Sequence, residues 1–225
     1  MKLLALDTAT ENCSAALRLG ERLFTRELES ARGHAEHILP MIDALLAEAG
    51  IGLAALDAIA FGRGPGSFTG VRLAASITQG LAFGAGLGVV AVSDLRALAQ
   101  RALELEPGCE RVLVCTDARM GEVYWAGFRA CEGLAEPVGP ERVSAPQTLT
   151  DAWAGALGIG RGFAAYPELQ AATGVSVPDG WDRLLPRAAD IAHLAVPEAL
   201  AGRLLAPEQA VPIYVRDRVA RPSSP

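Results

Sequence analysis

Lysine is almost absent from this chain of 225 residues: Lys2 is the only one, and the other cationic side chains are arginines and three histidines. Acidic residues outnumber lysine and arginine by 26 to 20, which gives a net charge of −6, and the basic residues form no cluster. A surface that binds nucleic acid takes most of its affinity from basic side chains that contact phosphates. We therefore expect no strong direct binding of RNA or DNA.

Cysteine is also scarce, and its spacing excludes the common zinc motifs. No two of the four cysteines (Cys13, Cys109, Cys115 and Cys131) form a CxxC pair. The apolar run at the N-terminus meets Asp7 and is too short for a signal peptide or a membrane span. We expect a cytoplasmic protein, in a reducing compartment, with no membrane partner.

Catalytic motifs are missing as well. The sequence has no HExxH zinc motif and no G-x-S-x-G nucleophile elbow. His34 and His37 lie three residues apart at an expected helix start, and Asp7 would be a third metal ligand, but a solvated helix entrance explains these histidines better. We predict no metal site and no catalytic residue.

Apolar residues, in contrast, make up 51% of the chain, enough for a large core. Their pattern over the first half predicts the element order β-β-β-α-β-α-β-α, with the first strand ending at Asp7. Its helices are expected at 35–49, at about 71–83 and at 94–105, the last with Ser93 as its N-cap.

A break at residues 106–108 separates a second half, whose pattern is weaker. Two strands joined by a turn at 119–121 are expected first, and the earlier one ends in Asp117, as the first strand of the chain ends in Asp7. This repeated pattern suggests a duplicated α/β unit. Further helices are expected at 147–154, 167–173 and 187–201.

The least ordinary stretch is residues 62–72, GRGPGSFTGVR, between an expected strand and helix. Backbone amides at a helix N-terminus can bind an anion. A P-loop, however, needs a lysine that is missing here, and the G-x-G-x-x-x-G spacing misses the dinucleotide fingerprint by one position. A rigid turn that shapes a helix packing surface is the simpler interpretation. The residues that would contact a nucleotide or anion are Asp7, Thr8, Gly66, Ser67, Thr69 and Gly70.

The two helices on either side of this loop carry apolar and small residues at helical spacing, and Gly80 and Gly84 have the small-xxx-small spacing that permits close helix packing. We predict that these helices form a protein-binding face. Its residues are expected to be Ile38, Ile42, Leu45, Val71, Ala74, Ala75, Thr78 and Ala82.

Six segments, in this order, resemble the bacterial TsaB (YeaZ) family: LALDTAT, HILPMI, GRGPGSFTGVR, VVAVSDLRALA, DARMGEVYWA and PIYVRDRVA. The resemblance covers nearly the full chain, although residues 131–182 carry little of it. It implies the ASKHA fold, the two-lobed α/β architecture of actin, Hsp70 and sugar kinases. The lobes are expected at 1–106, with the partner-binding helices, and at 107–225. The RPSSP ending replaces the Trp-Lys-Lys ending of some relatives.

The resemblance also implies a function. The family takes part in forming N6-threonylcarbamoyladenosine at position 37 of tRNAs that read ANN codons. Its members look like non-catalytic subunits that bind and activate the transferase TsaD, a paralogue, with TsaE as a further partner. On this basis tRNA is reached only through the complex, and the chain alone forms a homodimer.

Two departures from active relatives support a non-catalytic role. The metal histidines of TsaD relatives have HxxxH spacing, whereas His34 and His37 give HxxH, and Ala9 replaces a glycine of the first phosphate loop of active kinases. ATP or ADP is therefore expected only in the assembled complex. The alternatives are a stand-alone ASKHA phosphotransferase or ATPase that uses Asp7, Thr8 and the 66–70 loop, and a metallopeptidase, as older glycoprotease or M22 names suggest. The lack of a nucleophile–base pair and of a metal triad argues against both.

Overall fold

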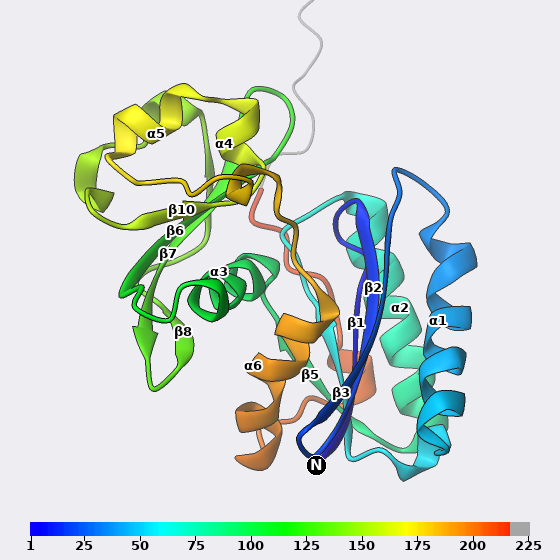
Figure 1. Cartoon of the computed structure of the whole chain (residues 1–225). Helices are drawn as coiled ribbons and strands as arrows, with labels where there is room; N and C mark the ends of the chain where they lie inside the picture. Colours follow the sequence, from blue (N-terminus) through cyan, green and yellow to red (C-terminus); the bar gives the residue numbers. More distant parts are fainter. Residues whose placement is uncertain (217–225) are drawn as a thin grey trace, which may run out of the picture.

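The computed structural model describes residues 1–216, so the RPSSP ending lies outside the described part of the chain. The described residues form two β-sheets with helices around and between them (Figure 1). No helix among them is both long enough and apolar enough to span a bilayer.

The first sheet has the strand order β3-β2-β1-β4-β5, with β1 antiparallel to β2 and parallel to β4. Its strands are β1 (Lys2–Asp7), β2 (Asn12–Leu19), β3 (Arg22–Glu29), β4 (Ala58–Gly62) and β5 (Gly88–Val92). Helix α1 (His34–Ala49), helix α2 (Phe68–Ala85) and helix α3 (Asp94–Leu105) complete this half. The element order predicted for the first half is therefore confirmed.

The helix ends follow local chemistry. The Ser67 and Ser93 side chains accept hydrogen bonds from the third-position amides of α2 and α3, which confirms Ser93 as an N-cap. Gly50 ends α1 and Gly86 ends α2, both in the left-handed conformation that glycine adopts without strain.

The first sheet is covered on both faces (Figure 1). Side chains of β1 alternate: Leu4 and Leu6 pack with α1 and α2, whereas Leu3 and Ala5 pack with α6 (Ala188–Leu200). Helix α6 comes from the second half of the sequence, so the chain returns to the first sheet near its end. The division into lobes at residue 106 stays a prediction.

The second sheet is smaller and has the order β10-β6-β7-β8, with β9 paired to β7. Its strands are β6 (Arg111–Asp117), β7 (Val123–Cys131), β8 (Leu134–Pro137), β9 (Arg142–Ser144) and β10 (Leu157–Ile159). The short helices α4 (Gly162–Ala165) and α5 (Glu168–Thr173) follow, and α3 lies between this sheet and α6 (Figure 1). The helices predicted at 167–173 and 187–201 are confirmed as α5 and α6.

The helix predicted at 147–154 is wrong. The structure has two 3-10 turns there, Pro146–Thr148 and Asp151–Trp153, separated by Leu149 in an extended conformation. The Thr148 hydroxyl donates to the carbonyl of Ala145, which competes with helical bonding. The Trp153 ring lies directly over Gly127, where a Cβ atom would overlap the ring. Packing of this ring on β7 therefore overrides the helical pattern.

Candidate functional site

The loop before α2 is fastened to the end of β1. The Thr8 hydroxyl donates to the carbonyl of Gly70 at 2.7 Å, and the Ser67 amide donates to the carbonyl of Ala9 at 2.7 Å. A Cβ atom on Gly66 would lie 2.4 Å from the Ala9 oxygen, and one on Gly70 would lie 2.0 Å from the Thr8 oxygen. These glycines are required because two backbone segments touch.

This arrangement brings together the six residues predicted to contact an anion, but it uses several of their polar groups inside the chain. The Ser67 amide bonds to the β1–β2 turn, and the Gly70 amide donates to the Ser67 hydroxyl at 3.0 Å. Asp7 and Thr8 are buried, whereas Ser67 and Thr69 are exposed. Close packing thus explains the glycines without a ligand, and anion binding stays a prediction.

Two carboxyl groups meet beneath this loop. Asp7 ends β1 and Asp94 begins α3; both are buried, and one oxygen of each would lie within 2.7 Å of a Cβ atom on Gly62. Asp7 Oδ1 also accepts from the Ala9 amide at 2.8 Å, and Asp94 Oδ2 accepts from the Gly64 amide at 2.5 Å. Burial raises the pKa of Asp7 to about 6, and burial together with the Asp7 charge raises the pKa of Asp94 well above its usual range.

Sequence reasoning placed Asp94 only as the first residue of a helix. Its contact with Asp7 spans 87 positions of sequence and is therefore invisible to local patterns. The sequence feature that could have indicated this contact is Gly62, the last residue of β4. A Cβ atom there would lie 2.4 Å from Asp94 Oδ1 and 2.7 Å from Asp7 Oδ1. A glycine at the end of a buried strand often marks such a close approach.

The two histidines do not converge on a shared site. His34 Nε2 lies 2.8 Å from the carbonyl of Thr10, and His37 is exposed. Across residues 1–216, no group of three His, Cys, Asp or Glu side chains is placed to hold a metal ion. His34 thus ties the start of α1 to the β1–β2 turn.

The eight side chains predicted to form a partner-binding face lie instead in the chain's own core. Their exposed fractions are 3% or less, and they line the faces of α1 and α2 that pack on the first sheet: Ile38, Ile42, Leu45, Val71, Ala74, Ala75, Thr78 and Ala82. In this conformation they cannot meet another protein. Apolar periodicity identifies the face of a helix that is buried, and here the sheet already buries it. Contact of α1 and α2 with a partner stays a prediction, which then requires their outer faces.

The outer face of α2 combines open glycines with exposed aromatic rings. A Cβ atom on Gly80 or Gly84 would meet nothing within 4 Å, whereas Phe83 is 80% exposed and Phe68 is 52% exposed. Leu39 on α1 is 44% exposed. A glycine inside a helix costs about 1 kcal/mol relative to alanine, so the chain's own packing does not explain Gly80 and Gly84.

The C-terminal segment joins this surface at the N-terminal end of α2. The Arg72 guanidinium lies 3.6 Å from the centre of the Phe68 ring, and Arg72 Nε donates to the Tyr214 hydroxyl at 2.7 Å. All three side chains are exposed. Sequence reasoning missed this cluster because Tyr214 comes from a segment with no regular structure.

The comparisons with known proteins decide the family. A family model described as TsaD: tRNA N6-adenosine threonylcarbamoyltransferase matches residues 28–166, more than half of the chain. The tRNA threonylcarbamoyladenosine biosynthesis protein TsaB of Escherichia coli (strain K12) is 41% identical, over 98% of this chain and 96% of that protein. The protein of the same name from Haemophilus influenzae is 42% identical, over 97% and 95% of the two chains. The chain belongs to the TsaB (YeaZ) family.

A solved structure agrees with this assignment. YeaZ from Pseudomonas aeruginosa has 44% sequence identity and a TM-score of 0.86, and the match covers 95% of this chain and 99% of that one. The resemblance stated from the six sequence segments is therefore confirmed, and so is an α/β fold with two sheets that the chain shares with YeaZ.

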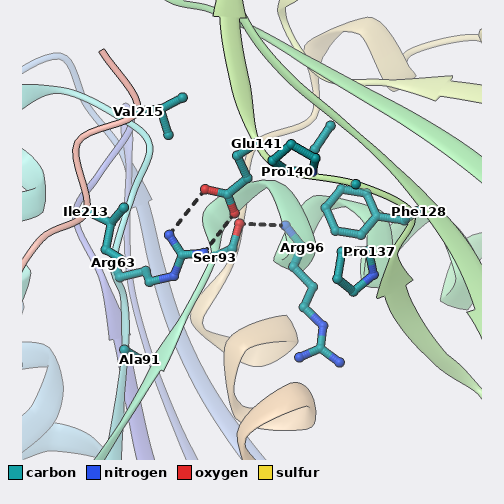
Figure 2. Close-up of a pocket in the computed structure, with 12 residues that line it drawn as sticks. Arg63, Ala91, Ser93, Arg96, Phe128, Pro137, Pro140, Glu141, Ile213 and Val215 are labelled. Carbon is teal, nitrogen blue, oxygen red and sulfur yellow. Dashed lines mark hydrogen bonds and ion pairs between the residues drawn. The ribbon is translucent and has the colours of Figure 1, made fainter. Parts of the chain in front are cut away.

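In this member of the TsaB family, a cavity lies between residues of the two halves (Figure 2). Its volume is about 490 Å³, and its walls are mostly apolar, with Phe128 and Pro137 on one side and Ile213 on the other. Arg63 and Glu141 bridge it with hydrogen bonds of 2.9 and 3.2 Å (Figure 2). None of the buried unpaired polar atoms of residues 1–216 lines this cavity. We therefore interpret this cavity as a gap in the packing between the two halves.

Proposed function

We propose that the chain acts in tRNA threonylcarbamoyladenosine biosynthesis as a non-catalytic subunit that binds and activates the transferase TsaD. Support for the pathway comes from the names of its full-length relatives. Support for the partner comes from the match of residues 28–166 to the TsaD family model, which links this chain to the transferase by sequence. TsaE is a further partner, tRNA is reached only through the complex, and the location is cytoplasmic.

The observation that carries the partner-binding role is the outer face of α2. Gly80 and Gly84 weaken the helix and leave open space, and Phe83 exposes a large apolar ring beside them. Small residues let a second helix approach closely, and large buried side chains are among the few residues that dominate the binding energy of an interface. We propose that TsaD docks on the outer faces of α1 and α2, and that a second copy of the chain occupies them when TsaD is absent.

Support for a non-catalytic role comes from the loop before α2. The Thr8 hydroxyl and the Ser67 amide are hydrogen-bonded within the chain, and Asp7 faces another buried carboxyl group. ATP or ADP would then enter only with the assembled complex. Calorimetry with Mg-ATP tests this: tight binding and turnover by the isolated chain would favour the stand-alone ATPase instead.

The substitution Gly84→Leu should change the stability of the chain and its affinity for TsaD in opposite directions. The new side chain enters open space and replaces a poor helix former, so unfolding of the chain alone should become harder by roughly 0.5–1 kcal/mol. The same side chain should block close helix approach and weaken TsaD binding at least tenfold, by about 1.4 kcal/mol. Calorimetric titration with TsaD measures the affinity, and thermal unfolding measures the stability.

Gly108→Leu is the matched control, because this exposed glycine lies in the break between the halves and its Cβ position is also nearly free. It should leave TsaD binding unchanged. Wild-type affinity in Gly84→Leu would remove α2 from the interface. Full-rate transfer to tRNA by TsaD and TsaE without this chain would remove the activating role.

A further inference from the structure

The Asp7–Asp94 pair has features that a simple structural hydrogen bond does not explain. Asp7 Oδ2 and Asp94 Oδ1 are buried without a hydrogen-bond partner if both groups are ionised, because carboxylate oxygens can only accept. Their other oxygens are occupied by the amides of Ala9 and Gly64. A proton carried by one of the groups and donated to the other would give both carboxyl groups a partner.

The charged groups around Asp7 and Asp94 also favour a pair that holds one proton over a pair that is fully ionised. Two other ionisable side chains act on the pair, His34 at the start of α1 and Arg63 after β4, and the Asp7 charge in turn contributes to the raised pKa of Cys13 in β2. The Arg63 guanidinium is engaged by Glu141, and the His34 ring is held on the carbonyl of Thr10. Arg63 forms no ion pair with Asp7 or Asp94, so two adjacent buried negative charges would repel each other with little compensation.

We propose that Asp7 and Asp94 share a single proton, and that this proton acts as a lock that fastens the loop before α2 to the end of β1. Asp94 is the donor and Asp7 is the ionised acceptor. The loop is held at Gly64, through the bond of its amide to Asp94 Oδ2, and at Ser67, through the bond of its amide to Ala9. Loss of the proton leaves like charges face to face below Gly62 and breaks the link between Asp94, which still accepts from the Gly64 amide, and Asp7 at the end of β1.

The sign of the pH dependence follows from proton counting. An unfolded aspartate loses its proton near pH 4, whereas Asp94 keeps its proton in the folded chain above that pH because its pKa is raised. The folded state then binds more protons than the unfolded state, so rising pH favours unfolding, up to tenfold in the equilibrium constant per pH unit until the folded group also ionises. The stabilisation from the pair's raised pKa values is therefore greatest at low pH and falls as pH rises, and the state with a single shared proton is the one present above the Asp7 pKa of about 6.

Asp94→Asn tests this directly. The asparagine oxygen can accept from Gly64 and its NH₂ group can donate to Asp7, so the variant imitates the protonated acid at every pH. We expect the melting temperature to fall less with rising pH in Asp94→Asn than in wild type. The difference in melting temperature between the two proteins should therefore grow by roughly 5 °C or more from pH 5 to pH 8. Asp117→Asn, at the partly exposed end of β6, is the matched control and should run parallel to wild type.

A second measurement does not depend on the variant. Infrared spectra of wild type at pH 8 should contain the carbonyl band of a protonated carboxyl group, since ordinary aspartates and glutamates are ionised there. Asp94→Asn should lack this band. A constant gap in melting temperature across the pH range, or a wild-type spectrum without the band, would overturn the proposal. Neither outcome bears on TsaD binding, so this test is independent of the proposed function.

Discussion

The turns after β1 and after β6 are equivalent positions in the two sheets, and their chemistry is opposite. Strands β1 and β6 each pair antiparallel with the next strand and parallel with a later one. Each ends in an aspartate whose Oδ1 accepts an amide two residues later at 2.8 Å, Asp7 from Ala9 and Asp117 from Arg119. The same local turn is thus built twice.

The difference lies in what surrounds each aspartate. Asp7 is buried, faces another carboxyl group and lies beneath the loop before α2, whereas Asp117 is partly exposed and pairs with the Arg119 guanidinium at 3.2 Å. Arg119 also contacts Glu11 of the β1–β2 turn at 3.2 Å. The first turn is therefore fixed by burial and backbone contact, and the second by charges that water screens. Substitutions should cost far more in the first turn.

The largest expected difference is between Gly70→Ala and Gly121→Ala. The Cβ atom on Gly70 would lie 2.0 Å from a backbone oxygen that is held in β1–β2, so the chain should lose roughly 3 kcal/mol of stability. Gly121 has a φ of 77° but open space around its Cβ position, so alanine should cost only about 1 kcal/mol there. Urea unfolding measures both, and equal costs would show that backbone conformation, not contact, governs the first loop.

A smaller effect is expected when the hydroxyl between the two backbone segments is removed. Thr8→Val keeps the shape of the side chain but removes the hydroxyl that donates to the buried carbonyl of Gly70, which should cost about 1 kcal/mol. Thr8→Ser restores the hydroxyl and should recover most of the loss in the same urea experiment. If Thr8→Val proved as stable as wild type, the Thr8–Gly70 bond would contribute nothing to holding the loop.

How much of this comparison the sequence could predict depends on the distance between the interacting residues. The element order of the first half follows from periodicity in runs of 5 to 18 residues, and the GRGPGSFTGVR stretch was singled out by its glycines. The strands β8, β9 and β10 have only three or four residues, too few for a period to be visible.

The site was harder to predict than the fold for two physical reasons. Apolar spacing on α1 and α2 identified their buried faces, while the outer face of α2 is marked by glycines whose open surroundings only the structure shows. The Asp7–Asp94 contact joins distant strand and helix ends, and an acid at a helix start is also what ordinary capping predicts. Sequence reasoning therefore found the loop but not the partner of its aspartate.

The smallest effects are expected in the exposed turn after β6. Two substitutions there distinguish the contribution of the Arg119 ion pairs from that of the backbone conformation. Arg119 is 75% exposed at its side chain, so Arg119→Ala should lose at most about 0.5 kcal/mol, and less in high salt. Arg119 also has a φ of 60°, which strains any residue with a Cβ atom. Arg119→Gly should then be about 1 kcal/mol more stable than Arg119→Ala, although both lack the ion pairs. Equal stabilities of Arg119→Ala and Arg119→Gly in urea unfolding would mean that the backbone of this turn adjusts to the side chain at residue 119. The turn after β6 would then differ even more from the rigid loop at Gly70.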